Sequence, residues 1–142
     1  MQALIPPRTE PYFGEEIVID EINTIRDLGK LVGNQIRILP GKMKWNTYGM
    51  VLKDYHIIAL NLYNLGLDHL PESIGTLSHL TELRVRSNRL NELPGTLSNL
   101  RQLKVIDLLV NPLQNISLPL KEFLRERENN GCRIDRDLED LF

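Results

Sequence analysis

Histidine and cysteine side chains are the groups in this chain that most often bind metals or act as nucleophiles. The sequence of 142 residues has three histidines and one cysteine. His56 and His79 lie 23 residues apart, and because that spacing recurs along the chain, we expect their imidazoles to be neighbours. Gln102 occupies the next equivalent position. The pattern therefore supplies no third ligand, and we predict no metal site.

Cys132 is not expected to act as a catalytic nucleophile. No histidine lies close to it in the pattern, and Arg133 follows it. A reactive cysteine needs a base, a group that orients the base and a site for the developing oxyanion. The chain also lacks the G-x-x-x-x-G-K-[ST] and G-x-G-x-x-G motifs of nucleotide sites. We therefore predict that the protein is not an enzyme and takes no cofactor.

The dominant feature of the sequence is a pattern that repeats every 23 residues, in three units that begin at Ile57, Leu80 and Leu103. Leucine accounts for 26 of the 142 residues. Seven apolar columns hold across the units without an insertion, and the six that follow the first are Leu60/Leu83/Ile106, Leu62/Val85/Leu108, Leu67/Leu90/Leu113, Leu70/Leu93/Ile116, Ile74/Leu97/Leu120 and Leu77/Leu100/Phe123. A fixed period of this kind indicates stacked structural repeats.

Each repeat is predicted to contain a short strand. Alternating apolar residues such as Leu83 and Val85 indicate a strand with one buried face. A single unit cannot bury its own leucines, so stacked units should form a parallel sheet against a shared core. Asn88 and Asn111 follow the strands, and we expect their amides to form a structural ladder with main-chain groups of the turns. Leu65 replaces asparagine in the first unit, which suggests either that this unit meets a cap or that its turn is distorted.

These motifs resemble the leucine-rich repeat family, whose pattern is L-x-x-L-x-L-x-x-N-x-L. The clearest unit is LTELRVRSNRLNELPGTLSN, and the first unit, IIALNLYNLGLDHLPESIGTLSH, has the L-P-x-x-I-G-x-L tail of the intracellular, Ras-group or Scribble-like type. The resemblance covers roughly residues 57–125. It implies a short α/β solenoid with its parallel sheet on the concave side. It is far more specific for the fold than for a function.

The segment before the repeats is predicted to cap them, because an open end would expose leucines and a strand edge. Apolar residues at helical spacing predict a helix from Asp20 to about Gly33-Asn34. A strand over 45–52 and a turn over 53–56 predict a hairpin with the first repeat strand. This flank resembles the N-terminal cap of plant-type leucine-rich repeats without its disulfide, and the flanks of archaeal leucine-rich repeat proteins.

The segment after the repeats should close the other end of the stack. Ser117 is expected to cap a helix that ends at Asn130-Gly131, and the remaining tail could dock or stay loose. We therefore divide the chain into a mobile N-terminus (1–14), an N-terminal cap with a helix and a hairpin strand (15–56), three leucine-rich repeats (57–116) and a C-terminal capping helix with its tail (117–142).

Residues between the buried leucines should point to the concave face, where we predict that a protein partner binds. Beside a first column of Ala59/Glu82/Val105, the two columns that carry the predicted site are Asn61/Arg84/Asp107 and Tyr63/Arg86/Leu109. We expect an Arg84–Asp107 ion pair between neighbouring strands, while the second column has residue types enriched where binding energy concentrates. Charge reversal at Arg86 together with Leu109→Asp is expected to abolish binding and to leave the melting temperature nearly unchanged.

Charge and composition argue against other classes of partner. Seventeen basic and nineteen acidic residues give a net charge of -2, so we predict no nucleic-acid partner. No apolar run approaches the ~18–20 residues that span a bilayer, and one cysteine cannot form an internal disulfide. We predict a cytoplasmic protein with no membrane partner, present as a monomer or weak homodimer. Two alternative functions stay open: a regulator of a switch protein such as a small GTPase, suggested by the resemblance, and a self-associating structural protein.

Overall fold

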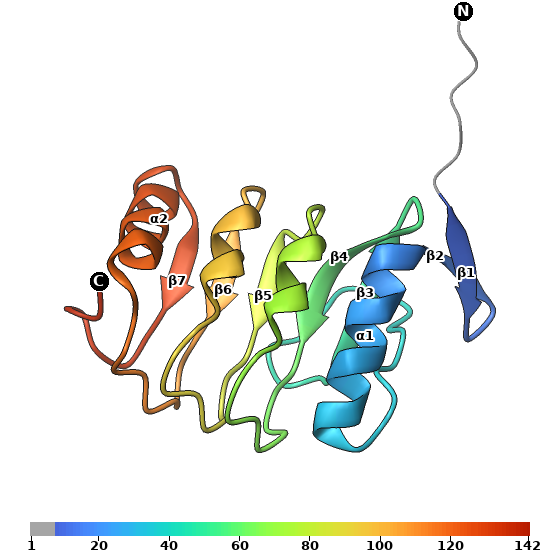
Figure 1. The fold of residues 1–142 in the computed structure, drawn as a ribbon, viewed down its shortest axis with the longest axis horizontal. Helices are drawn as coiled ribbons and strands as arrows, with labels where there is room; N and C mark the ends of the chain where they lie inside the picture. The colour runs from blue at the N-terminus through green and yellow to red at the C-terminus, as the bar shows by residue number, and fades with distance from the viewer. Residues whose placement is uncertain (1–7) are drawn as a thin grey trace, which may run out of the picture.

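The computed structural model describes residues 8–142, which form a row of strands with helical segments along one side (Figure 1). Five strands make one sheet in the order β3-β4-β5-β6-β7, and β1 and β2 form a separate two-stranded sheet. In chain order the elements are β1 (Thr9–Tyr12), β2 (Glu15–Val18), α1 (Ile19–Val32), β3 (Gly49–Lys53), β4 (His56–Asn61), the 3-10 helix η1 (Glu72–Thr76), β5 (Glu82–Arg84), the 3-10 helix η2 (Gly95–Asn99), β6 (Val105–Asp107), α2 (Leu118–Asn129) and β7 (Arg133–Asp135).

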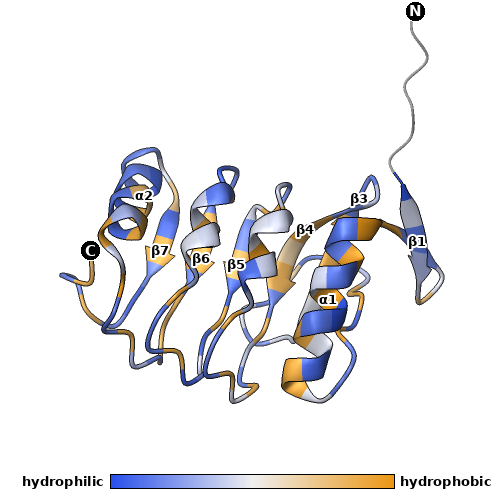
Figure 2. Ribbon diagram, in the orientation of Figure 1, coloured by the Kyte–Doolittle hydropathy of each residue, from blue (hydrophilic) through white to orange (hydrophobic). Residues whose placement is uncertain are grey.

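The three repeat strands pair in parallel, with equivalent residues side by side. Leu60 pairs with Leu83, and Leu83 pairs with Ile106, so one step across the sheet is a step of 23 residues in the sequence. All three side chains are fully buried in one continuous core. Figure 2 shows the apolar residues recurring along the row of strands and helical segments. The predicted short α/β solenoid, with a parallel sheet built from stacked repeats, is therefore confirmed.

The N-terminal cap contains the predicted helix and hairpin, with one shifted boundary. Helix α1 ends at Val32, and β3 pairs antiparallel with β4, so the first repeat meets a cap rather than another repeat. Strand β3 begins at Gly49 and not at Trp45. The Gly49 φ is 145°, and a Cβ atom there would lie 2.9 Å from the Arg37 carbonyl oxygen. The chain therefore turns sharply before β3, and residues 45–48 are not part of the strand.

The N-terminal segment differs from the mobile terminus predicted for residues 1–14. Residues 1–7 lie outside the described residues, but residues 9–12 form β1, which pairs antiparallel with β2. Two contacts with distant parts of the sequence hold this hairpin. The Tyr12 hydroxyl donates to the Ile36 carbonyl oxygen at 2.7 Å, and Arg26 pairs with Glu10 at 3.0 Å. The sequence of residues 1–14 alone could not predict these contacts, because their partners lie in and after helix α1.

Helix α2 closes the other end of the stack, and its Leu120, Phe123 and Leu124 are buried. Ser117 occupies the N-cap position but makes no side-chain capping hydrogen bond. That part of the prediction is wrong: Pro119 in the first turn has no N–H to donate to the Ser117 hydroxyl, and the Ser117 backbone carbonyl accepts from the Lys121 N–H at 2.9 Å. Within the described residues, no helix is both long and apolar enough to cross a bilayer.

The C-terminal tail, which the sequence left open, docks on the stack. Strand β7 pairs in parallel with β6, with Ile134 beside Ile106, and so extends the repeat sheet by one strand. Further along, Leu141 is buried, and the Arg136 guanidinium lies 4.2 Å from the Phe142 ring centroid. The tail therefore covers the end of the core that the last repeat would otherwise expose.

Candidate interaction surface

Within residues 8–142, the helical segments α1, η1, η2 and α2 all lie along one face of the sheet (Figure 1). We call the opposite side the open face; its residues are Ala59, Asn61, Tyr63, Glu82, Arg84, Arg86, Val105, Asp107 and Leu109. Strand pairing places Asn61, Arg84 and Asp107 side by side. The second predicted column stays in step after the strands end, since the N–H of residue 64 donates to the Arg86 carbonyl and the N–H of residue 87 to the Leu109 carbonyl, each at 3.0 Å.

Two of the six predicted binding residues, Asn61 and Asp107, are fully buried. Asn61 Nδ2 donates to the carbonyl oxygens of Lys44 at 2.8 Å and Trp45 at 3.0 Å, so the loop before β3 covers this end of the open face. Asp107 Oδ1 accepts from the Leu109 backbone N–H at 3.2 Å. Both side chains therefore support the surface from beneath and do not reach solvent.

Asp107 pairs more closely with Arg86 than with Arg84. Arg86 Nε donates to Asp107 Oδ2 at 2.8 Å, whereas Arg84 Nη1 lies 3.6 Å from the same oxygen. The shorter contact of Arg84 runs along its own strand, from Nε to Glu82 Oε2 at 2.7 Å. The predicted Arg84–Asp107 ion pair is thus present as the longer of two contacts. Two arginines and two carboxylates balance the charge in the middle of the open face.

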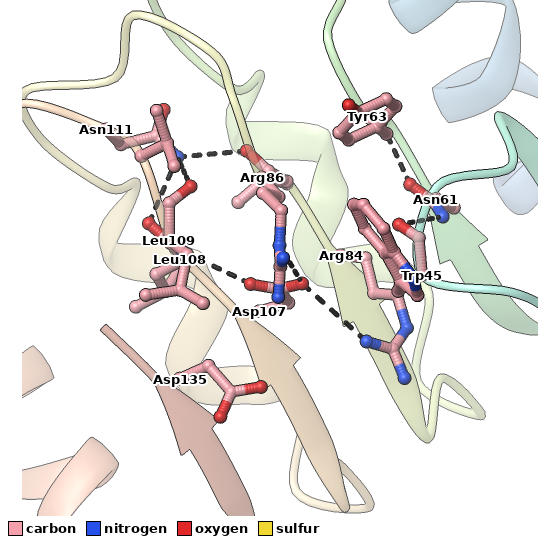
Figure 3. Close-up of polar contacts among 12 residues, drawn as sticks. Trp45, Asn61, Tyr63, Arg84, Arg86, Asp107, Leu108, Leu109, Asn111 and Asp135 are labelled. Atoms are coloured by element: carbon pink, nitrogen blue, oxygen red, sulfur yellow. Dashed lines mark hydrogen bonds and ion pairs between the residues drawn. The ribbon is translucent and has the colours of Figure 1, made fainter. Parts of the chain in front are cut away.

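Trp45, Tyr63 and Arg86 form a group that we call the aromatic–arginine cluster (Figure 3). The Trp45 and Tyr63 rings meet edge to face, with centroids 5.6 Å apart and planes at 84°. The Arg86 guanidinium lies 4.7 Å from the Trp45 ring centroid, within the range of a cation–π contact. Sequence reasoning missed Trp45 because it assigned this residue to a cap strand. Its being the single tryptophan of the chain was the available signal.

Two apolar residues, Leu109 and Val110, end the strand segment of the third repeat, and Leu109 stands in the same column as Arg86. Leu109 is half-buried, and Val110 is 59% exposed. The Val110 φ is 59°, close to the φ of the equivalent Asn64 (55°) and Ser87 (60°). A β-branched residue in this left-handed region is a conformational outlier. Val110 is therefore both exposed and strained.

Asn88 and Asn111 bond the main chain of the repeat turns. Asn88 Oδ1 accepts from the N–H groups of residues 65 and 67 at 3.1 and 3.0 Å, and its Nδ2 donates to the carbonyls of residues 62 and 85 at 2.8 and 2.9 Å. Asn111 Oδ1 accepts from the Leu90 N–H at 3.1 Å, and its Nδ2 donates to the carbonyls of residues 85 and 108 at 2.9 and 3.1 Å. Each amide thus joins its own turn to that of the preceding repeat.

Asp137 ends this series of turns. In the first two repeats, the N–H of the left-handed residue donates to a backbone carbonyl of the following repeat. At Val110, the carboxylate of Asp137 accepts this N–H instead, at 2.9 and 3.1 Å. The Asn111 N–H donates to the same carboxylate at 3.3 Å. A side chain from the tail therefore replaces the acceptor that a fourth repeat would provide.

The residues first considered for metal binding and catalysis lie away from the open face. Burial raises the pKa of the Cys132 thiol, which disfavours the reactive thiolate. His56 and His79 are stacked neighbours, as predicted. No third ligand follows in their column, where Gln102 stands, but α1 brings the Glu21 carboxylate to the two rings. The repeat pattern could not reveal this residue, since Glu21 lies outside the repeats.

No protein-family model matches the chain, and no curated protein matches it. Among solved structures, the chain is similar to a leucine-rich repeat protein of Leptospira interrogans, with 36% sequence identity and a TM-score of 0.40. The match covers 54% of this chain and 18% of that chain, so the matched part spans less than a fifth of the length of that protein. The repeat architecture is established here by the strand register itself. The Ras-group or Scribble-like subtype and the resemblance of the flanks to archaeal leucine-rich repeat proteins stay predictions.

Proposed function

We propose that the protein is an interaction module that binds a protein partner through the open face of its repeat sheet. The observation that carries this proposal is the aromatic–arginine cluster on the open face. Tryptophan, tyrosine and arginine are the residues most enriched where interface binding energy concentrates. Trp45 is 48% exposed, so its ring offers a partner a large apolar surface.

The cluster is also held rigid, which favours binding. Arg86 is fixed by its hydrogen bond to the buried Asp107, and Asp107 is fixed by the Leu109 N–H. The Trp45 main chain is held through its carbonyl, which accepts from Asn61, and its ring packs against Tyr63 and Arg86. Side chains that are already ordered lose less conformational entropy when a partner binds. Asn61 and Asp107, although buried, thus take part in the proposed site as positioning residues.

The charge balance of the open face indicates what kind of partner surface would fit. Because Arg84 and Arg86 are already paired with Glu82 and Asp107, the face does not offer a free positive field to an acidic partner. We therefore expect the partner to place apolar or aromatic side chains against Trp45 and Val110. Strands about 4.8 Å apart make this face narrow, so we expect a small, transient interface.

The structure changes the design of the first test. Charge reversal at Arg86 would place a carboxylate beside the fully buried Asp107, so the expectation of an unchanged melting temperature no longer holds. We choose Trp45→Ser with Val110→Asn instead, because both side chains are exposed. The matched control is Tyr55→Asn with Leu118→Ser, which removes an aromatic and an aliphatic residue that are 51% and 62% exposed outside the cluster.

The measurement is affinity capture from the native organism, with the bound proteins quantified by mass spectrometry. We expect wild type and the control variant to capture the same partner. The cluster variant should capture at least tenfold less of that partner. Equal capture by the cluster variant would contradict the proposal. Light scattering of the three proteins covers self-association, because a dimer abolished by the cluster variant would identify the partner as a second copy. Capture that depends on GDP or GTP would identify a switch protein.

A further inference from the structure

A second group of functional side chains lies where α1 meets the start of the repeat sheet. His56 is the first residue of β4, and His79 is the equivalent residue of the next repeat. Their rings are stacked, with centroids 3.5 Å apart and planes 16° apart. Glu21 comes from the first turn of α1. One ligand atom from each of these three residues lies within 4.8 Å of the others.

The Glu21 carboxylate is fixed in place. Glu21 is 2% exposed, and a buried carboxylate requires polar partners. Its Oε1 accepts from the Ile57 backbone N–H at 2.7 Å, and its Oε2 lies 2.5 Å from His56 Nδ1. Helix α1 and strand β4 therefore hold one carboxylate and one imidazole in a defined arrangement.

His79, in contrast, does little for the fold. Its side chain is exposed, and its hydrogen bond with Ser78 Oγ is 3.3 Å long. His56 and His79 line an open hollow together with Lys53, Asp54 and Gln102, so an ion can reach the two rings from solvent. The positive charge of Lys53 disfavours a cation in this hollow, and the negative charge of Asp54 offsets that effect.

We propose that Glu21, His56 and His79 bind a divalent transition-metal ion such as Zn²⁺. Two imidazoles and one carboxylate form a donor set that suits Zn²⁺. Bonds of ~2.1 Å in a tetrahedral site place ligand atoms about 3.4 Å apart. Glu21 Oε2 and His56 Nδ1, now 2.5 Å apart, would therefore have to separate by about 1 Å to admit the ion, while the exposed His79 ring can approach it by rotation. A fourth position stays open for water or for a group from a partner.

An alternative explanation is that Glu21 and His56 form a purely structural pair and that His79 only packs on it. The two explanations differ at His79, because the structural pair does not need this ring. His79→Gln is therefore the informative variant, and it should fold normally. His69→Gln is its matched control: His69 is also exposed, and its Nδ1 lies 2.6 Å from a carboxylate oxygen of Asp68, but no second imidazole stacks on it.

The test is isothermal titration of the whole chain with Zn²⁺. We expect saturable binding of about one ion per chain for wild type and for His69→Gln, and at least a tenfold weaker affinity for His79→Gln. Glu21→Gln keeps an acceptor for the Ile57 N–H and removes the charge, so its affinity should fall as well. The proposal is overturned if wild type shows no saturable binding, or if His79→Gln binds Zn²⁺ as tightly as wild type.

Discussion

The repeats and the two caps both bury apolar side chains, but different kinds of contact stabilise them. In the repeats, one strand register, one left-handed turn residue and one asparagine recur at intervals of 23 residues. In the caps, each stabilising contact occurs once, such as the Tyr12 hydroxyl on the Ile36 carbonyl or the Asp137 carboxylate on the Val110 N–H. Periodicity therefore determines the repeat structure, whereas individual polar contacts determine the ends.

This difference shows where function can arise in such a molecule. A repeat column alone presents similar positions in every unit. Each of the two proposed sites adds one cap residue to a repeat column: Trp45 joins Tyr63 and Arg86, and Glu21 joins His56 and His79. The caps thus make particular places on a periodic scaffold chemically distinct.

The largest expected change in the free energy of unfolding comes from truncating a core side chain of a repeat. Leu83→Ala should lower the free energy of unfolding by about 2–5 kcal/mol, because it removes a fully buried side chain from the middle column and leaves a cavity. Leu138→Ala, at a tail leucine that is 55% exposed, should change it by less than about 0.5 kcal/mol. Urea denaturation of both variants measures this, and similar losses would contradict a single shared core.

The next largest effect is expected at the asparagine ladder. Asn88→Ala should lower the free energy of unfolding by about 1–3 kcal/mol, because main-chain groups of residues 62, 65, 67 and 85 lose their partner in a buried turn. Asn115→Ala, at an exposed position, is the control. If Asn88→Ala and Asn115→Ala unfold at the same urea concentration, the ladder does not hold the turns together.

Most of the repeat region could be predicted from the sequence. The period of 23 residues fixes which leucines face the core, so Leu60, Leu83 and Ile106 had to lie side by side. The hairpin β1–β2 could not be predicted, because Tyr12 is held by a carbonyl that lies 24 residues away. Strand β7 escaped prediction because its three residues, Arg133–Asp135, show one buried apolar side chain and no repeat motif.

The candidate site could be predicted only in part, and burial explains the remainder. The column of Tyr63, Arg86 and Leu109 on the open face could be predicted, because successive side chains of a strand point to opposite faces of the sheet. Asn61 is covered by the loop before β3, whose Lys44 and Trp45 carbonyls accept from its amide. The 23-residue period carries no information about this loop. Asp107 is buried and bonds most closely to Arg86, whereas strand pairing alone predicted Arg84 as its partner.

A smaller effect is expected at the C-terminal end, where a cap side chain completes a repeat turn. Asp137→Ala should lower the free energy of unfolding by about 1 kcal/mol, since the N–H groups of Val110 and Asn111 lose a charged acceptor. Asp140→Ala removes the same charge from an exposed position in the same tail and should have little effect. Equal melting curves for the two variants would mean that the tail carboxylate is not a substitute for a fourth repeat.

The smallest expected effect has the opposite sign. Val110 adopts a φ of 59°, which costs an L-residue other than glycine or asparagine roughly 1 kcal/mol or more. Asn64 occupies the same position in the first repeat, so Val110→Asn should raise the free energy of unfolding by about 0.5–1 kcal/mol. Val110→Thr keeps the β-branch and adds a hydroxyl, so it separates backbone strain from the exposure of an apolar side chain. If threonine stabilises the protein as much as asparagine, exposure rather than strain is the cost at this position. If neither substitution raises the free energy of unfolding, the contacts of the turn already compensate for the strain. The exposed valine then costs the fold nothing.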